Sequence, residues 1–473
     1  MTFLQELAKN ANRTTTENGG ATNASSLSAC LDFFALGAAK RNDTEGLIKL
    51  FEKALKEDKQ KAVRILFYIR DIRGGQGERS IFRNCLRVLY KNSPDTFNQI
   101  VALIPEYGRW DDLIEFVDSE TVKVQVKDQW RLDLEAEHPS LLAKWLPSHN
   151  AHNSKTIELG KKWAKILCGE GNQGMHDYRQ ALSYLRNKIG ILETDMSQKR
   201  WKEINYEVLP AQALRKHGQA FRKHDSVRFQ AYLDGVKRGT KKVNTSTLYT
   251  YEVYDTLSTD PELADTLWEN LPEYTNENAL VVADVSGSMM GRPMSISVSL
   301  ALYFAEHSKG PFANKFMTFS RFPRLVEVMG NSLYEKMNNI ERADWDGNTN
   351  VEAVFDTILK AAVAANAKQN DLPQSVYIIS DMEFDSCVNA DETVFEEATR
   401  KFQEAGYKLP TIVFWNVNSR NNAVPVTKYD GNVVLVSGSS QSTFAMAVQG
   451  KNPIELMDEV INSERYAQIK IAD

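Results

Sequence analysis

Apolar residues follow two different patterns along the chain, and the change falls near residue 277. From Leu27 to that point they recur at spacings of three and four, which is typical of amphipathic helices. Beyond it, continuous apolar runs alternate with further helical segments. A continuous apolar run suits a strand that is buried on both faces of a parallel sheet. The patterns therefore predict an α + α/β protein, with an all-α front half and an α/β rear half.

The front half is predicted to contain a lead-in, a helical domain and a connector. Residues 1–26 are mostly polar, so we expect a loosely packed segment. Residues 27–255 show successive helical segments, residues 201–208 among them, and almost no strand pattern. This indicates antiparallel helical pairs packed into a solenoid, either a closed ring or an open horseshoe. Residues 256–276 are predicted to be an acidic connector.

The rear half, residues 277–473, is predicted to be a doubly wound domain with a mainly parallel sheet. The predicted strands are residues 279–284, 315–319, 325–329, 376–380, 410–416 and 432–437. The predicted helices are residues 294–308, 334–340, 351–365, 391–405, 442–448 and 454–464. Sheets of this type bind ligands beyond the carboxyl ends of their strands.

Oxygen-bearing side chains occur at two of these strand ends. Asp284, Ser286 and Ser288 alternate where the first strand ends, so their oxygens can converge in a tight loop. Thr349 precedes the helix at residues 351–365, and Asp381 follows the strand at residues 376–380. Carboxylate and hydroxyl oxygens suit Mg²⁺ rather than zinc. The alternative is that the two serines only cap a helix.

An Asp-x-Ser-x-Ser motif, then a threonine, then an aspartate after a later strand resembles the metal-ion-dependent adhesion site (MIDAS) of von Willebrand factor A (vWA) domains. The resemblance implies that these residues bind Mg²⁺ or another divalent cation. It also implies that an open position on the metal takes a carboxylate from a partner protein. The five residues are Asp284, Ser286, Ser288, Thr349 and Asp381.

Charge is distributed unevenly along the chain, whose net charge is −5. Residues 1–250 contain 40 Lys and Arg against 30 Asp and Glu, whereas the remainder contains 17 against 32. Residues 151–250 alone contain 19 basic and 9 acidic residues. A basic front half favours contact with nucleic acid. The alternative is an ordinary solvated helical surface.

A glycine-rich turn carries the first group of candidate RNA contacts, Arg73, Arg79 and Arg83. Glycines there allow backbone amides to approach an anion. Equally open is a simple turn between two helices, in which arginines pair with Asp71 or Glu78 and contribute little.

The densest basic stretch supplies the second group. Phe221, Phe229 and Tyr232 interleave it and could stack on bases. Their helical spacing favours a place in the core, so we assign RNA contact to the charged residues only. These are Arg215, Lys216, Arg222, Lys223, Arg228, Lys237 and Arg238.

A helical front half joined to a vWA-like domain resembles the TROVE–vWA architecture of the Ro autoantigen proteins. The front half is closer still to a related family of uncharacterised Ro-like proteins of bacteria, plants and phages. The resemblance implies a ring or horseshoe of HEAT-like repeats that binds non-coding RNA. The matching segments are residues 18–22, 70–79, 140–147, 178–182, 201–206 and 220–225.

Several classes of protein fit the sequence poorly. No apolar run approaches the length of a membrane span, and the N-terminus does not resemble a signal peptide. The four cysteines are far apart and form no CxxC pair, so we expect reduced thiols and a cytoplasmic protein. No histidine stands beside Ser286 or Ser288 in the sequence to activate a nucleophile.

These observations lead to one expectation and two alternatives. We expect a non-catalytic, Ro-like RNA-binding protein whose metal site engages a protein partner, with no DNA and no membrane among its partners. The first alternative is a protein–protein scaffold without RNA that uses the metal site to capture an acidic residue. The second is a metal-dependent hydrolase, because carboxylates cluster at residues 381–385.

Overall fold

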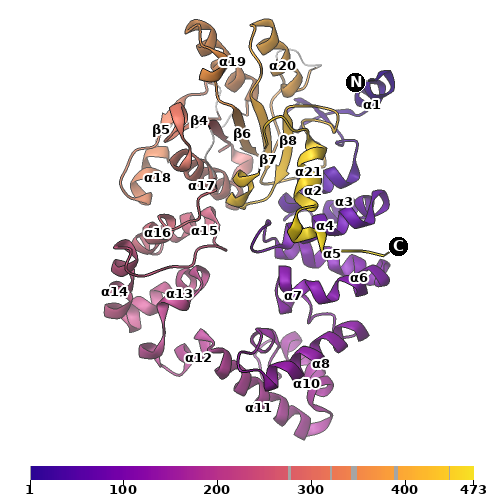
Figure 1. Cartoon of the computed structure of the whole chain (residues 1–473), viewed down its shortest axis with the longest axis vertical. Coiled ribbons are helices and arrows are strands. Elements are labelled where there is room, and N and C mark those ends of the chain that lie inside the picture. The colour runs from indigo at the N-terminus through magenta and orange to yellow at the C-terminus, as the bar shows by residue number, and fades with distance from the viewer. Residues whose placement is uncertain are drawn as a thin grey trace. The chain divides into compact units, whose positions relative to one another are not determined.

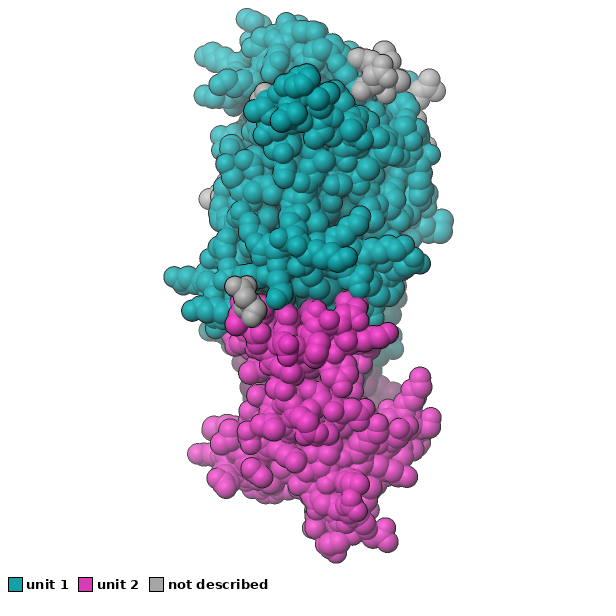
Figure 2. All heavy atoms as spheres, turned by 90° about the vertical axis from the view of Figure 1, so that its right-hand side faces the viewer, with its two compact units in different colours: residues 1–85, 210–219, 233–470 teal, residues 86–209, 220–232, 471–473 magenta. Residues whose placement is uncertain are grey.

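The chain forms two compact units (Figure 2). Unit 1 comprises residues 1–85, 210–219 and 233–470, and unit 2 comprises residues 86–209, 220–232 and 471–473. The computed structural model describes residues 2–274, 278–319, 322–341, 349–387, 392–446 and 448–472. Over these ranges, no helix has both the length and the hydropathy needed to cross a membrane.

A six-stranded sheet forms the centre of unit 1 (Figure 1). Its order is β5-β4-β3-β6-β7-β8, and every pair is parallel except β4 with β5. This confirms the mainly parallel sheet that the apolar runs predict. The strands are β3 (Ala279–Ala283), β4 (Lys315–Thr318), β5 (Leu325–Glu327), β6 (Ser375–Ser380), β7 (Thr411–Asn416) and β8 (Val433–Ser437).

Both faces of the sheet are apolar, which explains why its strands read as continuous apolar runs. Trp415 of β7 points to one face, where its ring centroid lies 4.8 Å from that of Phe444. Phe414, its neighbour in the strand, points to the other face and lies 5.8 Å from Phe384. Every residue of β3, β6, β7 and β8 is buried.

Helices of the rear half cover this sheet. Helix α17 (Arg292–His307) packs against β3, β4 and β6, and α19 (Val351–Ala364) lies beside α20 (Val394–Glu404). Helices α18 (Leu333–Glu341) and α21 (Pro453–Ile461) are also present as predicted. The helix predicted at residues 442–448 is instead the 3₁₀ helix η9 (Gln441–Ala445).

Front-half helices belong to the same unit as the sheet. Helix α2 (Ala29–Leu36) packs against β8, and the Ser437 hydroxyl donates a hydrogen bond of 2.9 Å to the Phe34 carbonyl. Helices α3 (Thr44–Glu57) and α4 (Lys59–Arg70) pack against α2. The domain boundaries at residues 26, 255 and 276 stay predictions.

The polar lead-in is packed rather than loose. After α1 (Phe3–Ala11), strands β1 (Arg13–Thr15) and β2 (Ala21–Asn23) form a hairpin. Asn23 is buried and exchanges backbone hydrogen bonds of 3.1 and 2.9 Å with Val424. A Cβ at Gly20 would lie 2.5 Å from the Phe384 carbonyl oxygen, so glycine is what allows this approach. The lead-in is held in place by backbone hydrogen bonds. The polarity of its side chains does not indicate such bonds.

The predicted connector contains a packed helix. Helix α16 (Pro261–Trp268) follows α15 (Thr250–Thr256) and buries Leu263 and Leu267. Its N-cap, Asp260, accepts a hydrogen bond of 3.1 Å from the Leu263 amide. Acidic residues therefore mark the start of a helix here rather than an extended linker.

The regular secondary structure of unit 2 is helical in all its described residues. Two of its buried aromatic side chains have hydrogen-bond partners within the unit: the Trp163 indole donates to the Ile114 carbonyl at 3.0 Å, and the Tyr178 hydroxyl donates to the Pro147 carbonyl at 2.9 Å. Its helices include α6 (Pro94–Ile100), α7 (Ile104–Tyr107), α8 (Glu120–Glu135), α9 (Leu142–Trp145), α10 (Ser154–Cys168), α11 (Gly171–Ile189) and α12 (Leu192–Ser197).

Three further helices complete the front half, and one prediction there is wrong. Helix α5 (Arg79–Asn92), α13 (Ala211–His224) and α14 (Ser226–Lys237) each run from one unit into the other. The helix predicted at residues 201–208 is two 3₁₀ turns, η4 (Trp201–Glu203) and η5 (Tyr206–Val208). The helical character of residues 27–255 is confirmed, whereas the HEAT-like repeat stays a prediction.

Candidate metal centre

Two buried aspartates meet at the carboxyl ends of neighbouring strands. Asp284 directly follows β3, and Asp381 directly follows β6. Because β3 and β6 are paired in parallel, their ends lie at the same edge of the sheet. The side chains are 0% and 2% exposed, respectively. The fold thus brings together two carboxylates that are far apart in the sequence.

The loop after β3 gathers the oxygens of the Asp-x-Ser-x-Ser motif. The Ser286 amide donates to one Asp284 carboxylate oxygen at 2.8 Å, and the Ser380 hydroxyl donates to the other at 2.6 Å. The Ser286 and Ser288 hydroxyl oxygens lie 3.1 Å apart. The serines are therefore next to each other, at the start of the 3₁₀ helix η6 (Gly287–Met289).

The two buried aspartate carboxylates repel each other. Burial, followed by the nearby charge of Asp381, raises the pKa of Asp284 to about 6. One Asp381 carboxylate oxygen, Oδ2, has no hydrogen-bond partner in the described part of the chain. Arg420 Nη2 lies 3.1 Å from this oxygen as an ion pair, without hydrogen-bond geometry. A divalent cation would offset this buried negative charge, so the residues present fit a metal.

Thr349 is held against the loop that carries Asp381. Its hydroxyl donates to Asp385 at 2.7 Å and accepts from the Asn18 side-chain amide at 2.9 Å. The same amide nitrogen donates to the Glu383 carbonyl at 2.6 Å. A hydroxyl oxygen has two lone pairs, so one remains for a cation. Among the described residues, Thr349 makes no direct hydrogen bond to the serines.

Sequence reasoning missed the residues that surround these five. Asn18 lies within segment 18–22, one of the matching segments, but a lone asparagine in a polar stretch carries no signal of its own. Arg420 pairs with both Glu17, at 2.7 Å, and Asp381. The Glu17 amide in turn donates to the Glu383 carboxylate at 2.7 Å. Only the tertiary structure shows that these residues surround the site, because they come from three segments that are far apart in the sequence.

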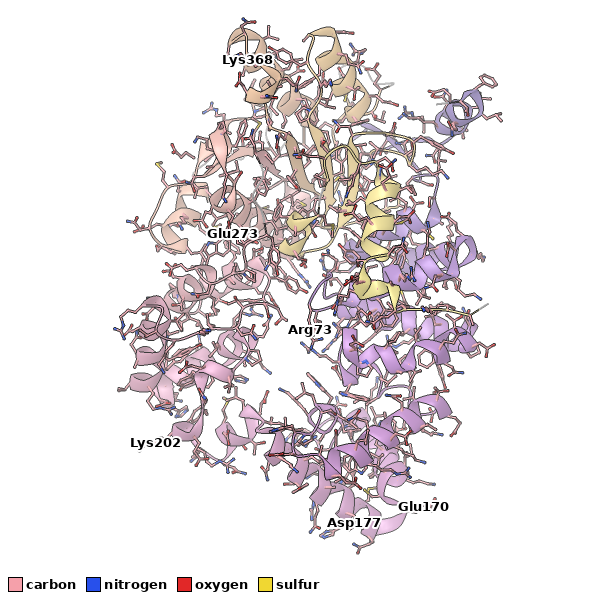
Figure 3. The ribbon with its side chains drawn as sticks, in the orientation of Figure 1. Arg73, Glu170, Asp177, Lys202, Glu273 and Lys368 are labelled. Carbon is pink, nitrogen blue, oxygen red and sulfur yellow. The ribbon has the colours of Figure 1, made fainter. Side chains whose placement is uncertain are left out.

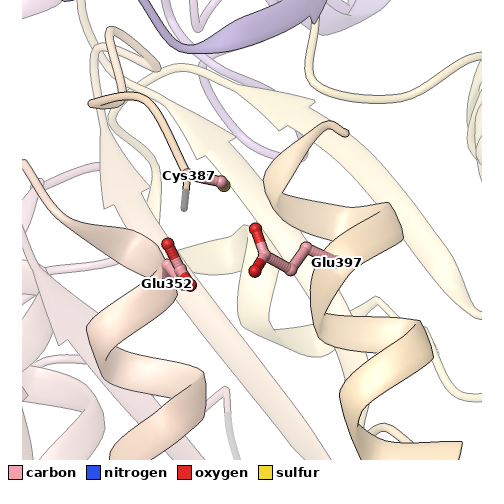
Figure 4. Close-up of side chains that lie close together, drawn as sticks. All are labelled: Glu352, Cys387 and Glu397. Atoms are coloured by element: carbon pink, nitrogen blue, oxygen red, sulfur yellow. The ribbon is translucent and has the colours of Figure 1, made fainter. Parts of the chain in front are cut away.

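A second acidic cluster is less suited to a cation (Figure 4). The ligand atoms of Glu352, Cys387 and Glu397 lie within 4.8 Å of one another, and all three residues are buried. However, Lys401 Nζ lies 2.5 Å from Glu352 and 3.1 Å from Glu397. Burial raises the pKa of the Cys387 thiol, which keeps it protonated. The lysine already supplies the positive charge that these carboxylates need.

The glycine-rich turn after α4 uses its backbone amides internally. The amides of Gln76, Gly77 and Glu78 donate to the carbonyls of Tyr68, Asp71 and Ile69, respectively. These donors are therefore engaged within the protein, and do not form the anion cradle that one interpretation of the turn requires.

The acids of this turn are paired with arginines from elsewhere in unit 1. Asp71 is fully buried and pairs with Arg465, while Glu78 pairs with Arg41 at 2.5 Å. The turn thus has a packing role. Of the candidate RNA contacts here, Arg73 and Arg79 are exposed and Arg83 is half-buried (Figure 3 labels Arg73).

The aromatic residues of the basic stretch belong to the core, as the helical spacing predicts. Phe221 and Phe229 are 0% exposed and Tyr232 is 2% exposed. Arg222 lies over the Phe229 ring, with its guanidinium carbon 5.5 Å from the centroid. The aromatic rings are therefore not available to stack on bases.

The basic residues of this stretch fall into two groups. Arg228 donates to the carbonyls of Trp201 at 3.0 Å and Ile204 at 2.7 Å, so it fastens a loop within unit 2. Arg215 lies 3.5 Å from Glu252, and Lys237 lies 3.1 Å from Glu262. In the second group, Arg222 is half-buried, whereas the other three are exposed and form no ion pair with another described residue: Lys216, Lys223 and Arg238.

Two family models match this chain. The domain of unknown function DUF2828 matches residues 16–126 and 118–284, and the domain of unknown function DUF7788 matches residues 278–470. A similar protein is the uncharacterized protein L728 of Acanthamoeba polyphaga mimivirus, which is 30% identical over 504 residues, covering 95% of this chain and 87% of that protein.

Among solved structures, that of the Deinococcus radiodurans RO (RSR) protein matches 93% of this chain and 100% of that chain, with a TM-score of 0.38 and 12% identity. The DUF2828 match extends over more than half of the chain, and the mimivirus protein is similar along nearly all of it. The chain therefore belongs to the DUF2828 family.

Proposed function

We propose that the protein binds non-coding RNA through its helical front half. The observation that carries this proposal is the basic excess of residues 151–250, which contain 19 basic and 9 acidic residues. Lys216, Lys223 and Arg238 are exposed, so their charges are free to neutralise phosphates. The Ro-like sequence segments add support. In this proposal the front half is a HEAT-like scaffold, and no DNA or membrane is involved.

The proposal assigns a vWA-type domain and a MIDAS-type site to the rear half. Asp284 and Asp381 would hold Mg²⁺ together with the hydroxyls of Ser286, Ser288 and Thr349. When bound, the cation would offset the two buried carboxylates and present an open position for a carboxylate of a protein partner. The buried Asp381 Oδ2, which forms an ion pair with Arg420 but accepts no hydrogen bond from a described residue, and the raised pKa of Asp284 support this assignment.

The protein is proposed to be a binding protein rather than an enzyme. The hydroxyls of Ser286 and Ser288 contact each other. Neither hydroxyl forms a hydrogen bond with a histidine among the described residues. The carboxylates of Glu383 and Asp385 hold Asn421 and Thr349, respectively, which accounts for them without a second metal. A localisation in the cytoplasm stays a prediction.

Material that co-purifies with the full chain tests the RNA proposal. Protein purified at low salt should carry nucleic acid, seen as a high ratio of absorbance at 260 nm to that at 280 nm. Ribonuclease treatment should lower the ratio, and deoxyribonuclease should not. Protein that carries no ribonuclease-sensitive material, and binds no added RNA, would favour the protein–protein scaffold instead.

A further inference from the structure

A pocket in unit 2 has polar and basic walls and contains none of the residues assigned above. Helix α11 forms one wall, and the remaining walls come from residues 148–150 and from α12 with the residue after it. Its volume is about 310 Å³. Among the described residues that line it, none is acidic. The lining side chains that matter here are Ser148, Arg179, Arg186, Asn187, Thr194 and Gln198.

Arg186 is a half-buried cation without a counter-ion in the described structure. Its guanidinium donates to the carbonyls of Ala143 at 2.9 Å and Leu146 at 2.7 Å, and to the Ser148 hydroxyl at 2.9 Å. All three acceptors are neutral. Burial lowers the pKa of Arg186, because no carboxylate compensates for the lost hydration. A guanidinium carries more donors than these bonds use, so some remain for a ligand.

A second arginine lies on the same face of the helix. Arg179, Ser183, Arg186 and Asn187 follow the spacing that aligns side chains along one side of α11. Arg179 is exposed and has no ion pair with any residue that the structure describes. The pocket therefore presents two guanidinium groups beside neutral hydroxyl and amide groups.

Two acids that lie near the pocket in sequence are engaged by other side chains. Asp195 of α12 is engaged by Arg200, whose Nη2 lies 2.5 Å from its carboxylate. Asp177 of α11, labelled in Figure 3, accepts a hydrogen bond of 2.7 Å from Gln173. A purely structural role for Arg186 explains its bonds to the carbonyls. It does not explain why a second unpaired arginine adjoins it in a pocket without acids.

We propose that this pocket binds one phosphate group of a nucleotide, either free or within a single-stranded RNA. Guanidinium groups match the geometry of phosphate oxygens, and hydroxyl and amide groups complete such sites. The volume is at the lower end of ligand pockets, which start at about 300 Å³, so it suits one nucleotide rather than a larger ligand. The RNA form of the proposal deepens the proposed function by naming a specific contact.

Binding of AMP, adenosine and a 5′-phosphorylated oligouridine to the full chain tests this assignment. Arg179→Gln removes one guanidinium that makes no internal ion pair, so the variant should fold normally. Its matched control is Arg131→Gln, since Arg131 is an exposed arginine of unit 2, 76% exposed, that does not line the pocket. Because hydrogen bonds to charged groups are strong, we expect Arg179→Gln to weaken AMP binding about tenfold.

The outcomes separate this pocket from the proposed RNA binding. Loss of AMP affinity in Arg179→Gln alone, with adenosine binding weak in every protein, supports a phosphate site. A parallel loss with the oligouridine shows that the ligand is RNA, whereas AMP binding without any RNA binding keeps the pocket and overturns the proposed function. RNA binding that Arg179→Gln leaves unchanged, with no AMP binding, overturns the pocket and keeps the function.

Discussion

At the scale of single residues, the buried carboxylates of Asp284 and Asp381 are the most unusual feature. Each is buried, and their mutual repulsion favours protonation of Asp284. A folded-state pKa of about 6, above the usual range for aspartate, means that the folded protein binds a proton more tightly than the unfolded chain does. Without metal, stability therefore falls as pH rises through the window between the ordinary aspartate pKa and about 6.

Replacing Asp284 should show whether the two aspartates bind a metal. We expect Mg²⁺ to raise the melting temperature of the wild-type protein at pH 8, and to have no such effect on Asp284→Asn. In EDTA the variant should be as stable as the wild type or more so, by on the order of 1–3 kcal/mol, because the repulsion is gone. Thermal unfolding with and without Mg²⁺ provides the measurement.

The matched control for this experiment is Asp118→Asn, which removes an exposed carboxylate of unit 2. It should respond to Mg²⁺ as the wild type does. An Asp284→Asn protein that gained the same stability from Mg²⁺ would show that the cation binds elsewhere.

The second acidic cluster differs from the two aspartates because a lysine, Lys401, already balances its carboxylates. Lys401 pairs with Glu352, Asp356 and Glu397, and Glu397 is only 2% exposed. Lys401→Met should therefore destabilise the protein by on the order of 3 kcal/mol, since buried carboxylates would lose their partner. Lys360→Met, which breaks only an exposed pair with Asp356, should change stability by less than about 1 kcal/mol. Equal urea midpoints for the two variants would mean that the cluster is not compensated as described.

At the scale of elements, the regular structure was largely predictable and the hairpin was not. Strands buried on both faces have continuous apolar runs, and this is why β3, β6, β7 and β8 were predictable from the sequence. The β1–β2 hairpin is polar, and its backbone pairs with Asp385, Thr393 and Val424. The pattern of apolar and polar side chains does not indicate such pairing. The short η4 and η5 turns were predicted as a helix because Trp201, Ile204 and Val208 have helical spacing, although Val208 is exposed in the structure.

In the candidate metal site, too, some residues were predictable from the sequence and others were not. The five candidate oxygen ligands could be named from the sequence because each lies at a strand or helix end within a recognisable motif, and their binding of a metal stays a prediction. The residues that orient them could not be named in this way, since Asn18 and Arg420 reach the site only through folding. In the basic stretch, sequence alone could not separate Arg228, which fastens a loop, from the exposed Lys223.

The hairpin should therefore contribute to metal affinity. Asn18→Ala removes the donor that holds the Thr349 hydroxyl, so we expect Mg²⁺ or Mn²⁺ to bind about tenfold more weakly, in line with the loss of an outer-shell partner. Calorimetric titration measures this change. Asn10→Ala, an exposed change in α1, is the control and should bind metal normally. An unchanged affinity in Asn18→Ala would show that Thr349 is not positioned by the hairpin.

At the scale of the whole molecule, the uneven charge predicts different tasks for the two halves. The rear half is acidic and repels polyanions, so it should add little to RNA affinity. Asp284→Ala should then abolish a Mg²⁺-dependent protein contact, seen in pull-downs with and without EDTA, while filter binding of RNA stays nearly unchanged. Loss of RNA binding in a folded Asp284→Ala protein would place the metal in the RNA site instead.

The salt dependence of RNA affinity shows directly whether the basic front half binds RNA. It should be measured for the wild-type protein, for the triple variant Lys216→Gln, Lys223→Gln, Arg238→Gln, and for a control that removes the same charge from exposed lysines of the acidic half. That control is Lys309→Gln, Lys360→Gln, Lys368→Gln.

We predict that wild-type affinity falls steeply with salt, and that the basic triple variant lowers the slope of log affinity against log salt by about 2, as expected for three lost phosphate contacts on a single strand. The control should keep the wild-type slope. Affinity that is indifferent to salt, or an equal loss in both triple variants, would contradict RNA binding by the basic front half.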